Sequence, residues 1–119
     1  MDKKSFIKVS EKDPPVYKPS GHNHTYNRRL AGPFNGSKHI EFIIGEMNKG
    51  GGAKNHFHTD SDQMMYILEG ALRIISPERE EKIFPGDLVV FLKGVEHEVQ
   101  CETEQAKFVV LYGPPRQEA

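Results

Sequence analysis

Short apolar segments separated by glycine, proline and aspartate turns constrain the fold of this chain more than any other feature. Clear examples are residues 38–47, 64–68, 71–76, 88–92 and 106–112. Segments of this length between turn residues are typical of β-strands, and no convincing amphipathic helix pattern accompanies them. The sequence therefore predicts about ten short strands that form an all-β sandwich or barrel.

Length and charge limit the function classes. A chain of 119 residues is enough for one domain with a modest core. Its 16 basic and 17 acidic residues are interspersed, which favours neither a nucleic-acid groove nor an anionic membrane surface. The apolar runs are too short to span a membrane, and the N-terminus lacks the apolar stretch of a signal peptide. With a single cysteine, Cys101, no internal disulfide can form, so we expect a cytoplasmic protein.

The stretch between residues 50 and 70 holds the residues that predict chemistry. His56 and His58 are two apart, so on a strand both rings would leave the same face. Gln63 follows across a short polar turn. A second stretch repeats the plan of glycine turn, apolar strand and glycine turn, and ends in His97. Three imidazoles and one amide oxygen can thus converge on a metal ion.

These two stretches resemble the paired motifs of the cupin superfamily. The residues that match the first motif are Gly50, His56, His58 and Gly70. The residues that match the second motif are Gly86, Gly94 and His97. Gln63 stands where the family usually has glutamate, Leu92 replaces a proline, and Cys101 replaces an asparagine.

The resemblance implies a cupin double-stranded β-helix, a jelly-roll barrel, over residues 21–119. Residues 1–20 contain a short strand candidate, Phe6–Val9, followed by Pro14, Pro15 and Pro19. Prolines remove donors from a β-ladder and favour an extended, edge-like path, so this segment is predicted to be an arm. In cupins such arms often pack on a neighbouring subunit, which implies a homodimer.

The predicted ligands His56, His58, Gln63 and His97 suit one divalent transition metal ion, namely Zn, Ni, Mn, Fe or Cu. Four protein ligands on a metal that accepts five or six leave positions for a substrate. An amide cannot act as a general base and leaves the charge of the metal intact. These features favour a small-molecule enzyme in which the metal acts as a Lewis acid. The expected reactions are isomerisation, tautomerisation or elimination on a sugar or carboxylate substrate.

The ligand set is similar to that of the pectin-degradation cupins, which convert ring-form unsaturated monouronates to linear keto sugars. The end of the chain is also similar to that group, because Tyr112, Pro114 and Arg116 match its aromatic, proline and arginine. Val110, however, stands where that group has an acidic residue. The sequence therefore does not assign the uronate activity.

Two alternative functions use the same site. One is a metal-dependent dioxygenase, and the other is a binding or sensor module without turnover. An acidic, tyrosine or lysine side chain opposite the metal would favour proton transfer over both. The catalytic residue is unknown from sequence, and the candidates are Tyr26, Arg28, Tyr66 and Tyr112.

Three further expectations concern which way side chains face. His22 and His24 form a second HxH pattern, which we interpret as solvated loop histidines because Gly21 and Asn23 favour a loop. In the segment 38–47, alternation favours Ile40, Phe42 and Ile44 toward the core, with His39 and Glu41 outside or at an interface. In the reversed register, His39 and Glu41 would line the pocket instead. The nearly continuous apolar run 88–92 is predicted to be buried on both faces.

Overall fold

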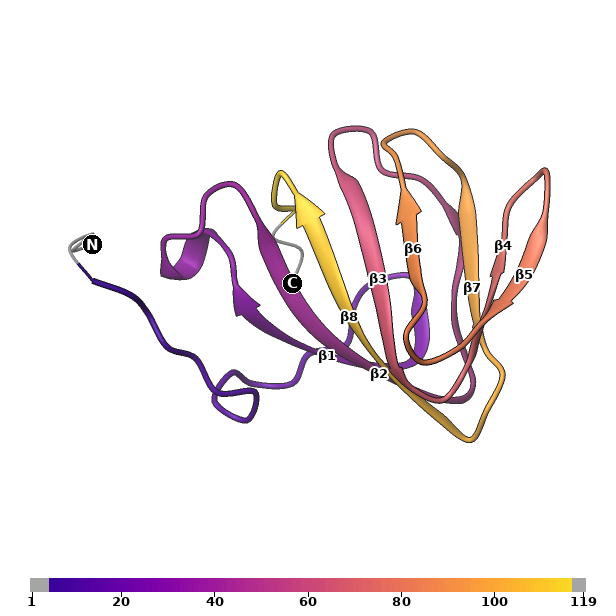
Figure 1. The fold of residues 1–119 in the computed structure, drawn as a ribbon, viewed down its shortest axis with the longest axis horizontal. Helices are drawn as coiled ribbons and strands as arrows, with labels where there is room; N and C mark the ends of the chain where they lie inside the picture. The colour runs from indigo at the N-terminus through magenta and orange to yellow at the C-terminus, as the bar shows by residue number, and fades with distance from the viewer. Residues whose placement is uncertain (1–4, 117–119) are drawn as a thin grey trace.

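The computed structural model describes residues 5–116, and nearly all of its regular structure is β-sheet (Figure 1). The eight strands of the described chain are β1 (His22–Ala31), β2 (Glu41–His56), β3 (Asp62–Glu69), β4 (Leu72–Ile75), β5 (Glu80–Ile83), β6 (Leu88–Phe91), β7 (His97–Cys101) and β8 (Gln105–Gly113). A single 3-10 turn, η1 (Pro33–Asn35), lies between β1 and β2. The all-β prediction is confirmed.

The strands form one antiparallel sheet in the order β5-β4-β7-β2-β8-β3-β6, with β1 paired to β2. The first half of β2 pairs with β8, and its last residues pair with β7. Because β2 changes partner along its length, the sheet curls into a half-barrel with β4, β5 and β7 on one side and β3, β6 and β8 on the other (Figure 1). The strand that joins the two sides ends at His56.

The core lies inside the curl. On β3 the side chains alternate, so that Gln63, Met65 and Ile67 point inward while Met64, Tyr66 and Leu68 point outward. The inward apolar side chains of the other strands complete one cluster, including Leu72, Ile74, Val99, Ala106, Phe108 and Val110. The inner face is therefore apolar at one end and polar near Gln63.

The turn between β3 and β4 depends on Gly70. Its φ of 75° lies in the left-handed region, which glycine adopts without strain. A Cβ atom there would also collide with the carbonyl oxygen of Gln105 and approach Thr103 Oγ1 to 2.7 Å. This glycine of the first motif thus allows β8 to pass closely beside the turn.

Two expectations about side-chain direction are wrong. In β2 the register is reversed, since Glu41 and Ile43 face the core while Ile40 is 55% exposed. Ile44 is nevertheless buried, because the N-terminal segment lies close to it. In β6, Leu88 and Val90 are exposed, so one face of this strand is not covered by the described chain.

Residues 5–20 form an extended segment rather than a strand, and the strand expected at Phe6–Val9 is absent. Its described contact with the sheet includes a bridge between Tyr17 and Asn27. Arg28 Nη1 donates hydrogen bonds to the carbonyl oxygens of Lys12 and Pro14. The segment is thus held along the outer face of β1.

Among the described residues, no helix is long and apolar enough to cross a membrane.

Candidate metal centre

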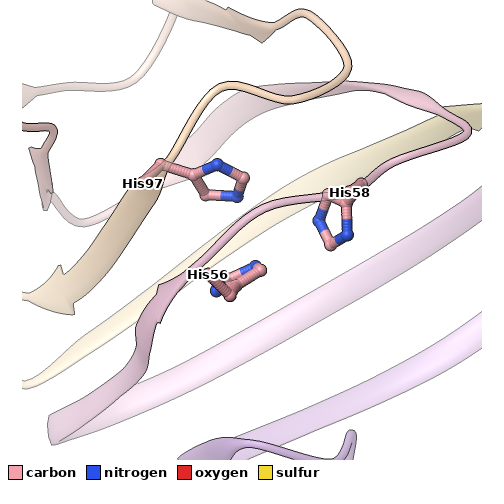
Figure 2. A group of neighbouring side chains, drawn as sticks. All are labelled: His56, His58 and His97. Atoms are coloured by element: carbon pink, nitrogen blue, oxygen red, sulfur yellow. The ribbon is translucent and has the colours of Figure 1, made fainter.

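Three histidines from two strands and a loop meet inside the open end of the curl (Figure 2). His56 is the last residue of β2, and His97 is the first residue of β7. These two residues are direct partners in the β2–β7 register. His58 follows two residues after His56, in the loop that leads to β3. The expected convergence of these three side chains is present.

The distances between the rings are short enough for a shared ion. The ring centroids lie 4.4 Å apart for His56 and His97, 4.9 Å for His56 and His58, and 5.4 Å for His58 and His97. One nitrogen from each ring lies within 4.8 Å of the others. The three histidines could therefore hold a metal ion.

Backbone carbonyls orient two of the rings. His56 Nδ1 lies 2.6 Å from the carbonyl oxygen of Lys54, and His97 Nδ1 lies 3.0 Å from that of Val95. A carbonyl oxygen only accepts, so each Nδ1 bears the proton and donates it. The lone pair of each ring is then on Nε2, and such fixed tautomers are typical of metal-binding histidines.

Two buried nitrogens provide the test of whether a metal fits. Within residues 5–116, His58 Nδ1 and His97 Nε2 are buried and have no hydrogen-bond partner. Leaving a buried polar atom unsatisfied costs about 1–3 kcal/mol. A metal ion among the three rings would satisfy His97 Nε2, so these residues fit a metal ion.

Gln63 lies next to His58 on the inner face of β3. Its Oε1 is 2.9 Å from His58 Nε2, and the side chain is 6% exposed. A spacing near 3 Å is also what two neighbouring ligands would have around one ion, given bonds of about 2.1 Å. The amide oxygen is thus close enough to join the histidines.

Burial keeps His58 and His97 neutral. Burial, and after it the nearby positive charge of Arg116, lower the pKa of His58 to about 4. Burial likewise lowers the pKa of His97 to about 4, against the opposing effect of its hydrogen bond to Val95. Phe91 stacks on the His97 ring at a centroid distance of 3.8 Å. Both rings are therefore neutral near pH 7, the state in which imidazole binds metals.

A fourth histidine lies beside the group. The His22 ring is 6.2 Å from that of His56, and its Nδ1 donates to the carbonyl oxygen of Ser20 over 2.8 Å. We expected His22 in a solvated loop, but it begins β1 and lines the inner cavity. A register shift after Asn23, with His24 at a φ of 47°, turns His22 inward against the simple alternation of the strand.

The four tyrosine and arginine candidates lie in different places. Tyr112 is close to the histidines, with its ring 5.4 Å from His58 and nearly perpendicular to it. Tyr26 and Arg28 line a hollow on the outside, beneath the N-terminal segment. Tyr66 is 44% exposed on the outer face of β3. Of the four, only Tyr112 lies beside the three histidines.

The prediction that Glu41 lies outside is wrong, because this carboxylate is fully buried. Arg29 Nε donates to Glu41 Oε2 over 2.6 Å, and the backbone N–H of Arg116 donates to Glu41 Oε1 over 2.8 Å. Glu41 lines the same inner cavity as Tyr112 and Val110. The acidic side chain of this cavity therefore comes from β2 rather than from position 110.

Within the described residues, two of the three cavities that border the histidines adjoin His56. The inner one is small, about 30 Å³, and is lined by His56, Gln63 and His97 together with Glu41 and Tyr112. The other is an open cavity of about 300 Å³ on the far side of His56 and His58. A small molecule would enter the site from the open cavity, since the inner one has room for little more than a water molecule.

The sequence also matches a known protein family. The family model described as "Cupin domain" matches residues 43–112, more than half of the chain. The protein is a cupin. No curated protein is significantly similar to it in sequence. The match includes all three histidines and Gln63, in agreement with the resemblance of the two motifs.

Solved structures of other cupins share the fold. The polyketide cyclase RemF from Streptomyces resistomycificus is 22% identical with a TM-score of 0.82, over 95% of this chain and 82% of that one. KdgF from Halomonas sp. is 20% identical with a TM-score of 0.77, over 94% of this chain and 96% of that one. A sugar phosphate isomerase of the cupin superfamily from Silicibacter pomeroyi is 20% identical with a TM-score of 0.78, over 94% of this chain and 78% of that one.

Proposed function

We propose that this cupin is a metal-dependent enzyme that acts on a small molecule. The residues that would hold the metal are His56, His58, Gln63 and His97. The observation that supports this proposal most directly is the buried Nε2 of His97, which has no hydrogen-bond partner in the described chain and faces two further histidines. Solved neighbours include proteins described as a cyclase and an isomerase, which supports a role in small-molecule chemistry.

The ligand chemistry favours a divalent transition metal. Three imidazoles suit Zn, Ni, Fe and Cu, and with an amide oxygen also Mn, whereas Ca and Mg prefer oxygen ligands only. Imidazole and amide groups are uncharged when they bind a metal, so the ion would keep its full positive charge and act as a Lewis acid on a bound oxygen. We therefore favour isomerisation, tautomerisation or elimination on a sugar or carboxylate substrate.

The residues of the chain would position the substrate and move protons. Tyr112 presents a ring next to His58, and its hydroxyl is a group that can donate or accept a proton. Glu41 is tied to Arg29 and to the backbone of Arg116. This carboxylate is therefore a positioning group for the end of β8 and the residues after it, rather than the base.

Elemental analysis of protein purified without a histidine tag tests the proposal. We expect close to one transition-metal ion per chain, and a loss of most of it in His58→Ala, because that change removes one of three imidazoles. His39→Ala is a matched control, since His39 is exposed and lies outside the site. Equal metal content in both variants and the wild type would remove these ligands from consideration.

A screen for turnover then separates the reaction classes. Small sugars and carboxylates should be isomerised or dehydrated without consumption of oxygen by the metal-loaded protein. Oxygen consumption coupled to substrate loss would instead indicate a dioxygenase. Binding without turnover across the screen would indicate a sensor or binding module.

We further propose that the protein is a homodimer. The outer face of β3 and β6 exposes a set of apolar side chains, namely Met64, Tyr66, Leu68, Leu88 and Val90. Apolar side chains clustered on a sheet face favour a protein partner. A second copy of the chain would cover this face together with the exposed Phe6 of the N-terminal segment.

A further inference from the structure

The open cavity beside the histidines has an unusual composition for a pocket. Its lining consists of Ser20, Gly21, His22, Lys54, Asn55, His56, Phe57, His58 and Arg116, around a volume of about 300 Å³. This volume is at the small end of the range for ligand pockets. The lining holds one lysine and one arginine, and none of these described residues is acidic.

Lys54 brings one positive charge to the wall. It lies near the end of β2, two residues before His56, and it is exposed. Lys54 forms no ion pair with any other residue in the range 5–116. By contrast, Lys49 on the same strand is paired with Glu104, and Lys107 on β8 with Glu11. The lysine beside the histidines is thus the one on β2 that no described carboxylate neutralises.

Arg116 brings the second positive charge from the other side. Its guanidinium carbon lies 5.3 Å from the centre of the Tyr112 ring, and that ring lies next to His58. Its backbone N–H is fixed to the buried carboxylate of Glu41 over 2.8 Å.

We propose that this cavity binds a small organic anion, with Lys54 and Arg116 as its counter-charges and the three histidines at its inner end. The inference rests on the proposed metal enzyme and specifies its substrate class as a carboxylate or a phosphate ester rather than a neutral sugar. A carboxylate or phosphate group accepts charge-assisted hydrogen bonds from arginine in a bidentate manner and from lysine as a point charge. The remainder of the molecule would face the metal.

The geometry also gives the anion a fixed orientation. Lys54 lies on β2 and Arg116 lies after the end of β8, and both line the same cavity as His56 and His58. A molecule that contacts both side chains therefore lies next to the rings. This arrangement holds the reacting part of the substrate close to the metal ligands without a loop closure.

Calorimetric titration of the zinc-loaded, full-length protein tests the inference. The matched probes are lactate and lactamide, which are close in size and differ in charge, and inorganic phosphate is a third probe. We expect lactate to bind at least about tenfold more tightly than lactamide at low salt, and less tightly as salt is raised. Tighter binding of phosphate than of lactate would identify a phosphate ester as the natural group, and the reverse order a carboxylate.

Variants identify the counter-charges. Arg116→Gln and Lys54→Gln should each weaken lactate binding by about tenfold, because each removes one charge-assisted contact. In contrast, Arg116→Lys and Lys54→Arg should keep part of the lactate affinity. Arg79→Gln is the matched control, since its side chain is 79% exposed and paired with Glu81 in the β4–β5 hairpin. This control should bind lactate as the wild type does.

The two proposals fail in different ways. Zinc content is measured in every variant, and a wild type that retains no zinc contradicts the metal enzyme. Zinc-loaded protein that binds lactate and lactamide equally contradicts the anion site while leaving the metal site intact. Lactate binding that is unchanged in both glutamine variants would likewise contradict the anion site.

Discussion

Gln63 places an uncharged amide oxygen 2.9 Å from His58, at a position where cupins usually have glutamate. A carboxylate there would cancel part of the charge of a bound metal and would raise the pKa of a metal-bound water. The amide would do neither, so it would preserve the strength of a bound ion as a Lewis acid. The neutral side chain is therefore part of the argument for the proposed chemistry.

Gln63→Glu tests this role at nearly constant side-chain size. Metal affinity should rise by about tenfold or more, since one added ion–ion contact contributes over about 1.4 kcal/mol. Turnover by Lewis-acid catalysis should fall in the same variant. Measurement of metal affinity and activity together decides the matter, and tighter metal with undiminished turnover would contradict the Lewis-acid role.

His97 predicts how the metal-free protein responds to acid. Its pKa is lowered by burial to about 4 in the folded chain, against 6.5 as the ordinary value. Between these values the unfolded chain binds a proton that the folded chain does not, so stability is complete above about pH 6.5 and is lost as pH falls toward 4. The contribution of one such histidine is about 1.4 kcal/mol per pH unit.

Urea unfolding of metal-free wild type and His97→Gln at pH 7 and pH 5 measures this effect. The wild type should lose more stability than the variant over that interval, because the variant has no proton to take up at position 97. The comparison cancels the other titrating groups. Equal losses in the two proteins would show that His97 is not held neutral by the fold.

At the scale of elements, β1 and β2 show what the sequence could and could not predict. The glycine-framed motifs predicted the strands that bring His56, His58 and His97 together, because the turns and the spacing are local features. The position of His22 depends on a register shift opposite β2, which alternation within β1 alone cannot reveal. The inward position of His22 was therefore missed.

The orientation of the side chains at the start of β2 was predicted wrongly for a related reason. Both faces of its first half are apolar, since Ile43 packs in the core and Ile44 lies beneath the N-terminal segment. Alternation alone then cannot decide which face is inside. Glu41 is placed inside because Arg29 on the neighbouring strand pairs with it. A charge partner on another strand is information that the segment itself does not contain.

At the scale of the whole molecule, the outer sheet face explains why β6 looked buried on both sides. Leu88 is 54% exposed and Val90 is 45% exposed, and they are register partners of Tyr66 and Met64 on β3. The core therefore covers one face of β6, and no described residue of this chain covers the other face. A second copy of the chain would complete it.

The homodimer is tested by mass in solution. Light scattering at micromolar concentration should give twice the mass of one 13.5 kDa chain. Leu88→Lys with Val90→Lys should shift the protein to monomer, because two charges on each copy would have to be buried in the interface. Arg79→Lys is the control and should remain dimeric. Deletion of residues 1–12 should also lower the mass if the N-terminal arm contributes, whereas full-length protein that is monomeric from the start would contradict the proposal.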